Sequence, residues 1–117
     1  MPTSIDAYLG IHTRALTLES RRTELLANNL ANADTPGFKA RDIDFRSALA
    51  AAGGTVAGGT MDADLKYRVP MAPALDGNTV DAQLEQSDFA ENAVRYQATL
   101  TFINSKLRAL MTAITGQ

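Results

Sequence analysis

Residues 25–39 read LLANNLANADTPGFK, and this stretch marks the point where a long helix must stop. Three asparagines lie inside the predicted helix end: Asn28, Asn29 and Asn32. Pro36 disfavours helical backbone at Thr35, and Pro36-Gly37 fits the centre of a type II turn in which the glycine has a positive φ. The sequence therefore predicts a helix that ends near residue 33 and is followed by a fixed turn.

The asparagines need a reason, because each costs a helix about 0.5 kcal/mol relative to alanine. Asn32 can cap the last carbonyls of the helix, and asparagine tolerates the left-handed conformation found there. Asn28 and Asn29 lie inside the helix, so capping does not account for them. An asparagine amide both donates and accepts hydrogen bonds. We therefore interpret Asn28 and Asn29 as side chains that bond a returning segment or another subunit.

Upstream of the turn, residues 3–33 carry a wide apolar face at helical spacing. Thr3 and Asp6 fit a T-x-x-D capping pattern at the start of this segment. We expect one continuous helix about 45 Å long. Its predicted packing positions are Leu9, Leu16, Leu26 and Leu30.

Residues 80–115 return to helix with a cleaner period. Apolar residues recur there at alternating steps of four and three, the spacing of a heptad seam. The seam consists of Phe89, Ala93, Tyr96, Leu100, Ile103, Leu107, Leu110 and Ile114. The predicted fold is mainly α, with the long N- and C-terminal helices packed as an antiparallel coiled-coil pair.

The middle of the chain is different. Residues 48–60 read ALAAAGGTVAGGT, and two glycine pairs among small residues predict a flexible linker. The following DLKYRV alternates apolar and polar residues, as a short strand does. The predicted organisation is an N-terminal helix over 1–33, a glycine-rich middle with turns, linker and short extended segments over 34–79, and a C-terminal helix over 80–117.

Composition excludes several classes of function. The net charge of −2 gives no basic surplus for nucleic-acid phosphates, and the absence of cysteine excludes disulfides and thiolate metal sites. No apolar run reaches the roughly 20 residues that span a bilayer, and the N-terminus has no signal-peptide pattern. Export, if it occurs, is expected without a cleaved signal.

Few residues suggest chemistry. The only histidine, His12, lies on the apolar stripe and is interpreted as a packing or interface residue. Asp42 and Asp44 lie beside Arg41 and Arg46, which favours a solvated, salt-bridged segment over a divalent metal site. No nucleophile with a base and an orienting group is visible. We therefore predict no enzyme activity, no cofactor or metal, and no small-molecule substrate.

Two amphipathic helices joined by a short middle leave apolar surface in water, because a hairpin covers only one side of each helix. Helices gain most of their stability from tertiary packing. Part of the missing packing is therefore expected to come from other chains.

LLANNLANADTPGFKARDIDF resembles the N-terminal signature of bacterial flagellar axial proteins, the rod, hook and hook-associated families. LDGNTVD and the tail FAENAVRYQATLTFINSKLRALMTAI are most similar to the proximal rod proteins among them. The signature falls on Asn28, Asn29, Asn32, Thr35, Pro36, Gly37 and Phe38.

The resemblance implies a structural subunit that leaves through the flagellar type III export gate and assembles into a helical, torque-transmitting rod in the periplasmic space. The terminal helices would form the inner layer of that tube, with the middle segment outside it. Implied partners are other copies of the chain, a FliE-like adaptor and FlgC-like rod subunits. The alternatives are a FlgC-like neighbouring subunit and, from another class, a soluble helical adaptor or secretion chaperone.

Overall fold

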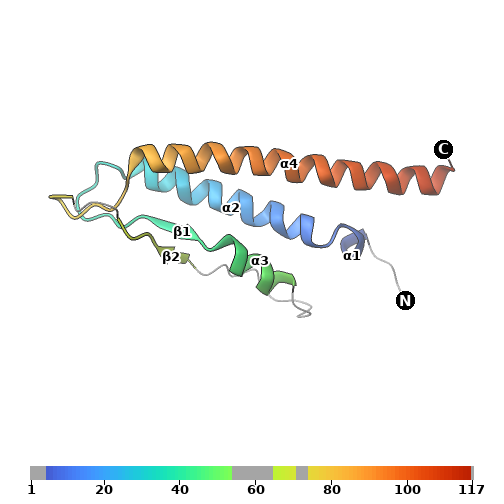
Figure 1. The fold of residues 1–117 in the computed structure, drawn as a ribbon, viewed down its shortest axis with the longest axis horizontal. Helices are drawn as coiled ribbons and strands as arrows, with labels where there is room; N and C mark the ends of the chain where they lie inside the picture. The colour runs from blue at the N-terminus through green and yellow to red at the C-terminus, as the bar shows by residue number, and fades with distance from the viewer. Residues whose placement is uncertain (1–4, 54–64, 71–73, 117) are drawn as a thin grey trace.

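A computed structural model describes residues 5–53, 65–70 and 74–116 of the chain. The elements are α1 (Ile5–Leu9), α2 (Ile11–Ala31), β1 (Arg41–Ile43), α3 (Phe45–Gly53), β2 (Leu65–Tyr67) and α4 (Ala82–Thr115). Figure 1 shows α4 lying antiparallel along α2, with α1 at the N-terminal end of α2. The predicted pair of long terminal helices is therefore confirmed.

The sequence predicted one continuous N-terminal helix, and this prediction is wrong: the helix divides at Gly10. This residue has φ 48° and ψ −121°, a combination that glycine reaches far more readily than residues with a Cβ. The chain therefore bends between α1 and α2. The predicted Thr3 cap lies outside the described residues.

The helix α4 begins and ends with distinct caps. The Asp81 side chain accepts hydrogen bonds from the backbone N–H groups of Gln83 and Leu84, which have no partners within the helix. Gly116 ends the helix in the left-handed conformation at φ 74°, and its N–H bonds the Thr112 carbonyl. The 34 residues between these caps span about 50 Å, as predicted.

Strands β1 and β2 pair antiparallel, with Arg41 opposite Tyr67 and Ile43 opposite Leu65. The predicted extended segment at Leu65–Tyr67 is thus confirmed. The predicted linker is wrong for residues 48–53, because α3 extends through Gly53; alanine-rich sequence favours helix, and this helix has an apolar neighbour in α2. Residues 54–60 of that linker lie outside the described residues.

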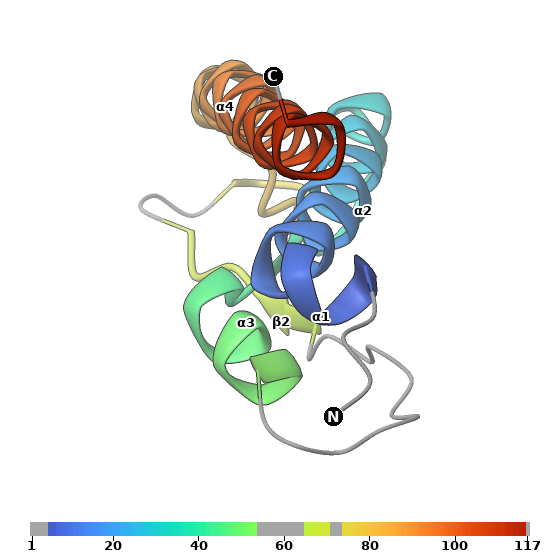
Figure 2. The same ribbon diagram turned by 90° about the vertical axis from the view of Figure 1, so that its right-hand side faces the viewer.

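The apolar core is small and centres on α2. Leu18 of α2 and Ile43 of β1 are buried, and Leu25, Phe45 and Leu49 pack around them. Viewed end-on in Figure 2, α4 lies on one side of α2 and α3 lies below it. The helix α2 therefore joins two layers: the core with β1 and α3, and the seam with α4.

Candidate interaction site at the closed end of the helix pair

The chain reverses after α2 through the predicted turn. Gly37 has φ 72°, and the Phe38 N–H bonds the Thr35 carbonyl at 3.3 Å, so the predicted positive φ is confirmed. The segment before α4 holds this turn on both sides: the Gly37 N–H donates to the Asp76 carbonyl at 2.8 Å, and the Thr79 N–H donates to the Phe38 carbonyl at 2.9 Å. The turn is therefore one half of a two-loop structure.

Asn78 caps the end of α2 from a distant part of the sequence. Its buried Nδ2 donates to the carbonyls of Asn32, Ala33 and Thr35 at 2.8–2.9 Å. Its Oδ1 accepts from the Val80 N–H at 2.7 Å, which orients the amide. Sequence reasoning did not identify Asn78 as a site residue, although its segment, LDGNTVD, carried part of the resemblance.

Asn29 bonds a returning segment, as predicted. Its side chain donates to the Arg41 carbonyl at 2.7 Å and accepts from the Arg41 N–H at 3.2 Å. The same amide donates to Glu85 of α4 at 3.1 Å, so one buried asparagine joins α2, β1 and α4. This requirement accounts for a poor helix former inside α2.

The other two asparagines remain on the surface side of the turn. Asn32 Nδ2 donates to the carbonyl and the side-chain oxygen of Asn28, each at 2.8 Å, and Asn32 Oδ1 accepts from the Thr35 hydroxyl. Asn32 ends the helix as predicted, but at φ −103°, so the suggested left-handed backbone is wrong at this residue. The exposed Asn28 bonds only within its own turn in the part of the chain described, and its role toward another subunit stays a prediction.

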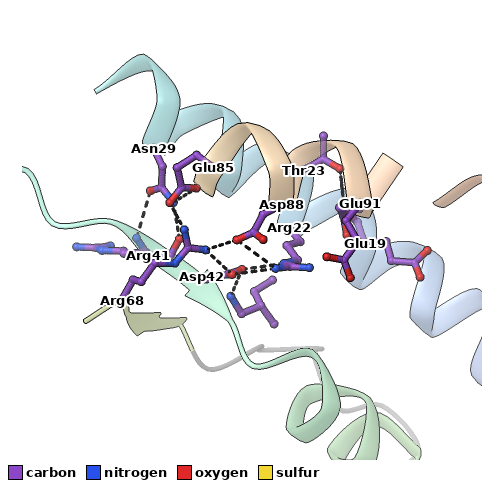
Figure 3. A network of polar contacts seen from close by, with 12 residues as sticks. Glu19, Arg22, Thr23, Asn29, Arg41, Asp42, Arg68, Glu85, Asp88 and Glu91 are labelled. Atoms are coloured by element: carbon purple, nitrogen blue, oxygen red, sulfur yellow. Dashed lines mark hydrogen bonds and ion pairs between the residues drawn. The ribbon is translucent and has the colours of Figure 1, made fainter. Parts of the chain in front are cut away.

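A cluster of ion pairs, the Arg68 cluster, links the β1–β2 sheet to α2 and α4 (Figure 3). Arg22 of α2 forms a bidentate pair with Asp42 of β1 at 3.0 and 3.1 Å. Arg68, just after β2, bonds Asp42 at 2.8 Å, Asp88 of α4 at 3.1 Å, and also Glu85 of α4. Two guanidinium groups and three carboxylates thus meet where α2, α4 and the β1–β2 sheet converge.

The predicted salt bridges of Asp42 and Asp44 therefore form, but not with the neighbours expected. Asp42 is half-buried and binds Arg22 and Arg68, whereas Asp44 binds Lys66 at 2.9 Å on the surface. Arg41 instead lies over the Tyr67 ring and bonds its hydroxyl. Alternation along β1 explains the error, because residues 41 and 42 point to opposite faces.

Burial and charge act in opposite directions on these carboxyl groups. Burial raises the pKa of Glu85 above its ordinary 4.5, although the hydrogen bond from Asn29 and the charge of Arg68 oppose it. Burial alone would also raise the pKa of Asp42, but the hydrogen bonds and charge of Arg22 hold it below 3.8. Asp42 therefore remains ionised, and its ion pairs are formed at neutral pH.

Polar residues also form the row of α4 that meets α2. Glu85, Asn92 and Thr99 are buried at intervals of seven. Asn92 donates to the Glu19 carbonyl and to Thr23, and Thr99 bonds Glu19. One heptad further, the Lys106 ammonium donates to the Tyr8 carbonyl at 3.3 Å. The seam between the helices is thus largely hydrogen-bonded.

The predicted packing residues surround this polar row at different depths. Leu26 is fully buried. Half-buried members are Leu9, Leu16, Leu30, Tyr96, Leu100, Ile103 and Leu110. Exposed members are Phe89, Ala93, Leu107 and Ile114. His12 is half-buried and stacks on Phe102 at 5.6 Å between ring centroids, which confirms its packing role.

Grooves lie beside the seam. One of about 670 Å³ runs along α2 between Leu16 and Asn28 and reaches Tyr96 of α4. Another of about 440 Å³ lies at the turn, between Asn28, Phe38 and Tyr67. Neither groove is a closed cavity. None of the helices described has the length and apolarity needed to cross a bilayer.

Comparison with known proteins gives one consistent result. A family model described as flagella basal body rod protein matches residues 9–39, which include the turn. The flagellar basal body rod protein FlgB of Cereibacter sphaeroides is 46% identical over 121 residues, covering 93% of this chain and 94% of the relative. The chain belongs to the FlgB family of flagellar basal body rod proteins. The FlgB proteins of Aeromonas hydrophila and Salmonella typhimurium are 44% and 42% identical, each over at least 96% of both chains.

Membership in the FlgB family makes this chain a structural subunit of the flagellar basal body rod, and the comparisons do not favour the adaptor or chaperone alternatives. The family model ends at residue 39, so it covers α2, the turn and Arg22, but not the other four members of the ion-pair cluster. In this FlgB-family chain the turn after α2, the β1–β2 sheet and the start of α4 lie at the same end of the helix pair (Figure 1).

Proposed function

We propose that this FlgB-family chain builds the wall of a helical rod by placing the apolar stripe of α4 against neighbouring subunits. One observation carries the proposal: the row of α4 bonded to α2 is polar, whereas the heptad stripe from Phe89 to Ile114 lies on its flank. Successive helical residues are separated by 100°, so Leu100 and Leu107 face well away from Thr99 and Lys106. Leu107 is 37% exposed and Ile114 is 76% exposed.

Such a surface suits an open assembly. Large exposed apolar patches on a protein of this size mark contacts with other molecules. Head-to-tail contacts that do not close into a ring generate helical filaments. In this arrangement the helices of residues 1–33 and 80–117 form the inner layer of a torque-transmitting tube, and residues 34–79 lie outside it.

The proposed partners are other copies of the chain, FlgC-like rod subunits and a FliE-like adaptor. Before assembly the chain passes the flagellar type III export gate without a cleaved signal and reaches the periplasmic space. Its role is structural, without catalysis. Family membership and the sequence resemblance support these assignments.

The test is Leu107→Asp, with Ser105→Asp as a matched control that adds the same charge to an exposed position on the other side of α4. A charge without a partner in a packed contact costs several kcal/mol. We expect Leu107→Asp to abolish swimming and rod incorporation but to leave the circular dichroism of the free chain unchanged. Normal swimming with Leu107→Asp, or equal loss with Ser105→Asp, would overturn the proposal.

A further inference from the structure

The seam between α2 and α4 contains a buried carboxyl group that is not part of the ion-pair cluster. Glu19 is 3% exposed, and among the described residues it forms no ion pair within 4.0 Å. Its Oε1 accepts a hydrogen bond from Thr99 at 3.0 Å, and its Oε2 is buried with no partner. An ionised carboxylate in such a place loses hydration that nothing replaces.

The hydrogen bonds around Glu19 are short of one donor. The single proton of the Thr99 hydroxyl has two acceptors at 3.0 Å, Glu19 Oε1 and the Arg95 carbonyl. Asn92 uses its Nδ2 on the Glu19 carbonyl and on Thr23, which leaves its buried Oδ1 without a donor. A proton on the Glu19 carboxyl supplies the missing donor, because a protonated carboxyl group both donates and accepts.

We propose that Glu19 is protonated when α2 and α4 are packed together, and that loss of this proton loosens the pair, so that the seam acts as a proton-dependent joint. The charged groups around it fit this role. Arg95 of α4 is tied to Glu91 at 2.7 Å, with both side chains about half exposed, and Arg22 of α2 is tied to Asp42 (Figure 3). Each of these arginines is therefore already partnered by another carboxylate.

The direction of the pH effect follows from burial. Burial raises the pKa of Glu19 above its ordinary 4.5, while the Thr99 hydrogen bond and the charge of Arg95 oppose it. A carboxyl group with a raised pKa in the folded state binds more protons than it does in the unfolded chain. The contribution of Glu19 to the stability of the helix pair is therefore complete below the ordinary pKa of 4.5 and is lost as pH rises from there through the raised pKa.

Glu19→Gln tests the joint, because the amide has the same shape and carries a permanent donor. The matched control is Glu24→Gln, an exposed glutamate on the same helix. The readout is the urea concentration at which half of the helical circular-dichroism signal of the full chain is lost, measured from pH 4.5 to neutral pH. If the helices pair only in the rod, the readout is the urea concentration that releases half of the subunit from isolated basal bodies.

We expect the midpoint of the wild type and of Glu24→Gln to fall as pH rises. Glu85 contributes the same sign of slope in every variant, so the comparison isolates Glu19. Glu19→Gln should lose most of the fall and lie above the wild type at neutral pH. Equal slopes in wild type and Glu19→Gln, or a lower midpoint of Glu19→Gln at every pH, would overturn the proposal.

A second variant leaves the buried residue untouched. Arg95→Gln removes a charge that stabilises ionised Glu19, so the fall of the urea midpoint should shift to higher pH. Arg95→Lys keeps the charge and should leave this fall near its wild-type pH. Carbon-13 NMR of the Glu19 carboxyl, in the free chain or in the assembled rod, reports the proton directly. A carboxyl that titrates at 4.5 or below in the packed state would refute the joint.

Discussion

At the scale of single residues, Asn78 is the strongest candidate for a large effect from a small change. Replacing it with alanine removes the donor of the Ala33 carbonyl, whereas the Asn32 and Thr35 carbonyls keep backbone N–H donors from the turn. A buried group left unpaired costs about 1–3 kcal/mol. We expect Asn78→Ala to lower the urea midpoint of the chain by an amount in that range. Circular dichroism of the helices measures it.

Two comparisons give this prediction its specificity. Asn28→Ala removes an exposed amide of the same type and should change the midpoint little. Asn78→Asp keeps the acceptor for Val80 but points a carboxylate at three carbonyl oxygens, so it should be no better than alanine. If Asn78→Ala behaves like Asn28→Ala, the cap is not important for stability.

Prediction from the sequence succeeded for residues whose role depends on the backbone close to them in the chain. Gly37 was predicted from the turn type alone, and its positive φ is confirmed. Asn29 was predicted to bond a returning segment because nothing local explained it, and Arg41 is that segment. Asn78 escaped prediction because its acceptors lie more than 40 residues away, and an asparagine after Asp-Gly looks like an ordinary turn residue.

At the scale of elements, the Arg68 cluster holds the β1–β2 sheet against α2 and α4. Arg68→Ala leaves Asp42, Glu85 and Asp88 with only Arg22 nearby, and removing one partner from a buried ion pair costs about 3–5 kcal/mol. We expect a correspondingly large drop in the urea midpoint of the chain. Lys66→Ala, which breaks an exposed pair with Asp44, should have little effect.

A double substitution separates lost attraction from unpaired charge. Arg68→Met alone leaves Glu85 buried without its cation, whereas Arg68→Met with Glu85→Met removes both charges. Because the cost of a broken buried pair comes largely from the charge left behind, the double variant should be more stable than Arg68→Met alone. A double variant that is less stable would show that Glu85 has another essential role, for example through Asn29.

The existence and length of α4 were predictable, because its apolar period and its caps are local features. The face it turns to α2 was not. A heptad of apolar residues predicts a seam, but a polar row with the same heptad spacing makes the bonds across it. Glu85, Asn92 and Thr99 bond α2, and Lys106 bonds Tyr8 of α1. Hydrogen-bonded polar residues within such a seam fix register and orientation. Only the partner positions on α2, unknown from sequence, distinguish the two rows.

At the scale of the whole molecule, the chain is an elongated body of 64 × 29 × 18 Å, and the buried residues of α4 all lie between Glu85 and Thr99. The turn, the β1–β2 sheet and the start of α4 lie at the closed end (Figure 1). At the other end, Ile5 of α1 is 59% exposed and Met111 near the end of α4 is 64% exposed. The sequence indicated that apolar surface would remain uncovered. The sequence could not indicate which part of the surface stays uncovered, because that depends on which side of each helix the β1–β2 sheet and α3 occupy.

This asymmetry predicts a gradient of order along α4 in the free chain. Amides of residues 82–99, which lie beside α2 and the cluster, should exchange hydrogen slowly, and those of residues 104–115 should exchange quickly because few tertiary contacts hold that end. Hydrogen exchange of the dilute chain and of the assembled rod, followed by mass spectrometry, measures the difference. Assembly should protect residues 104–115 strongly and change residues 82–99 little. Leu107→Asp should retain the slow exchange of the closed end without gaining protection at the open end. Uniformly slow exchange along all of α4 in the dilute chain would mean that neighbouring subunits are not needed to hold the open end.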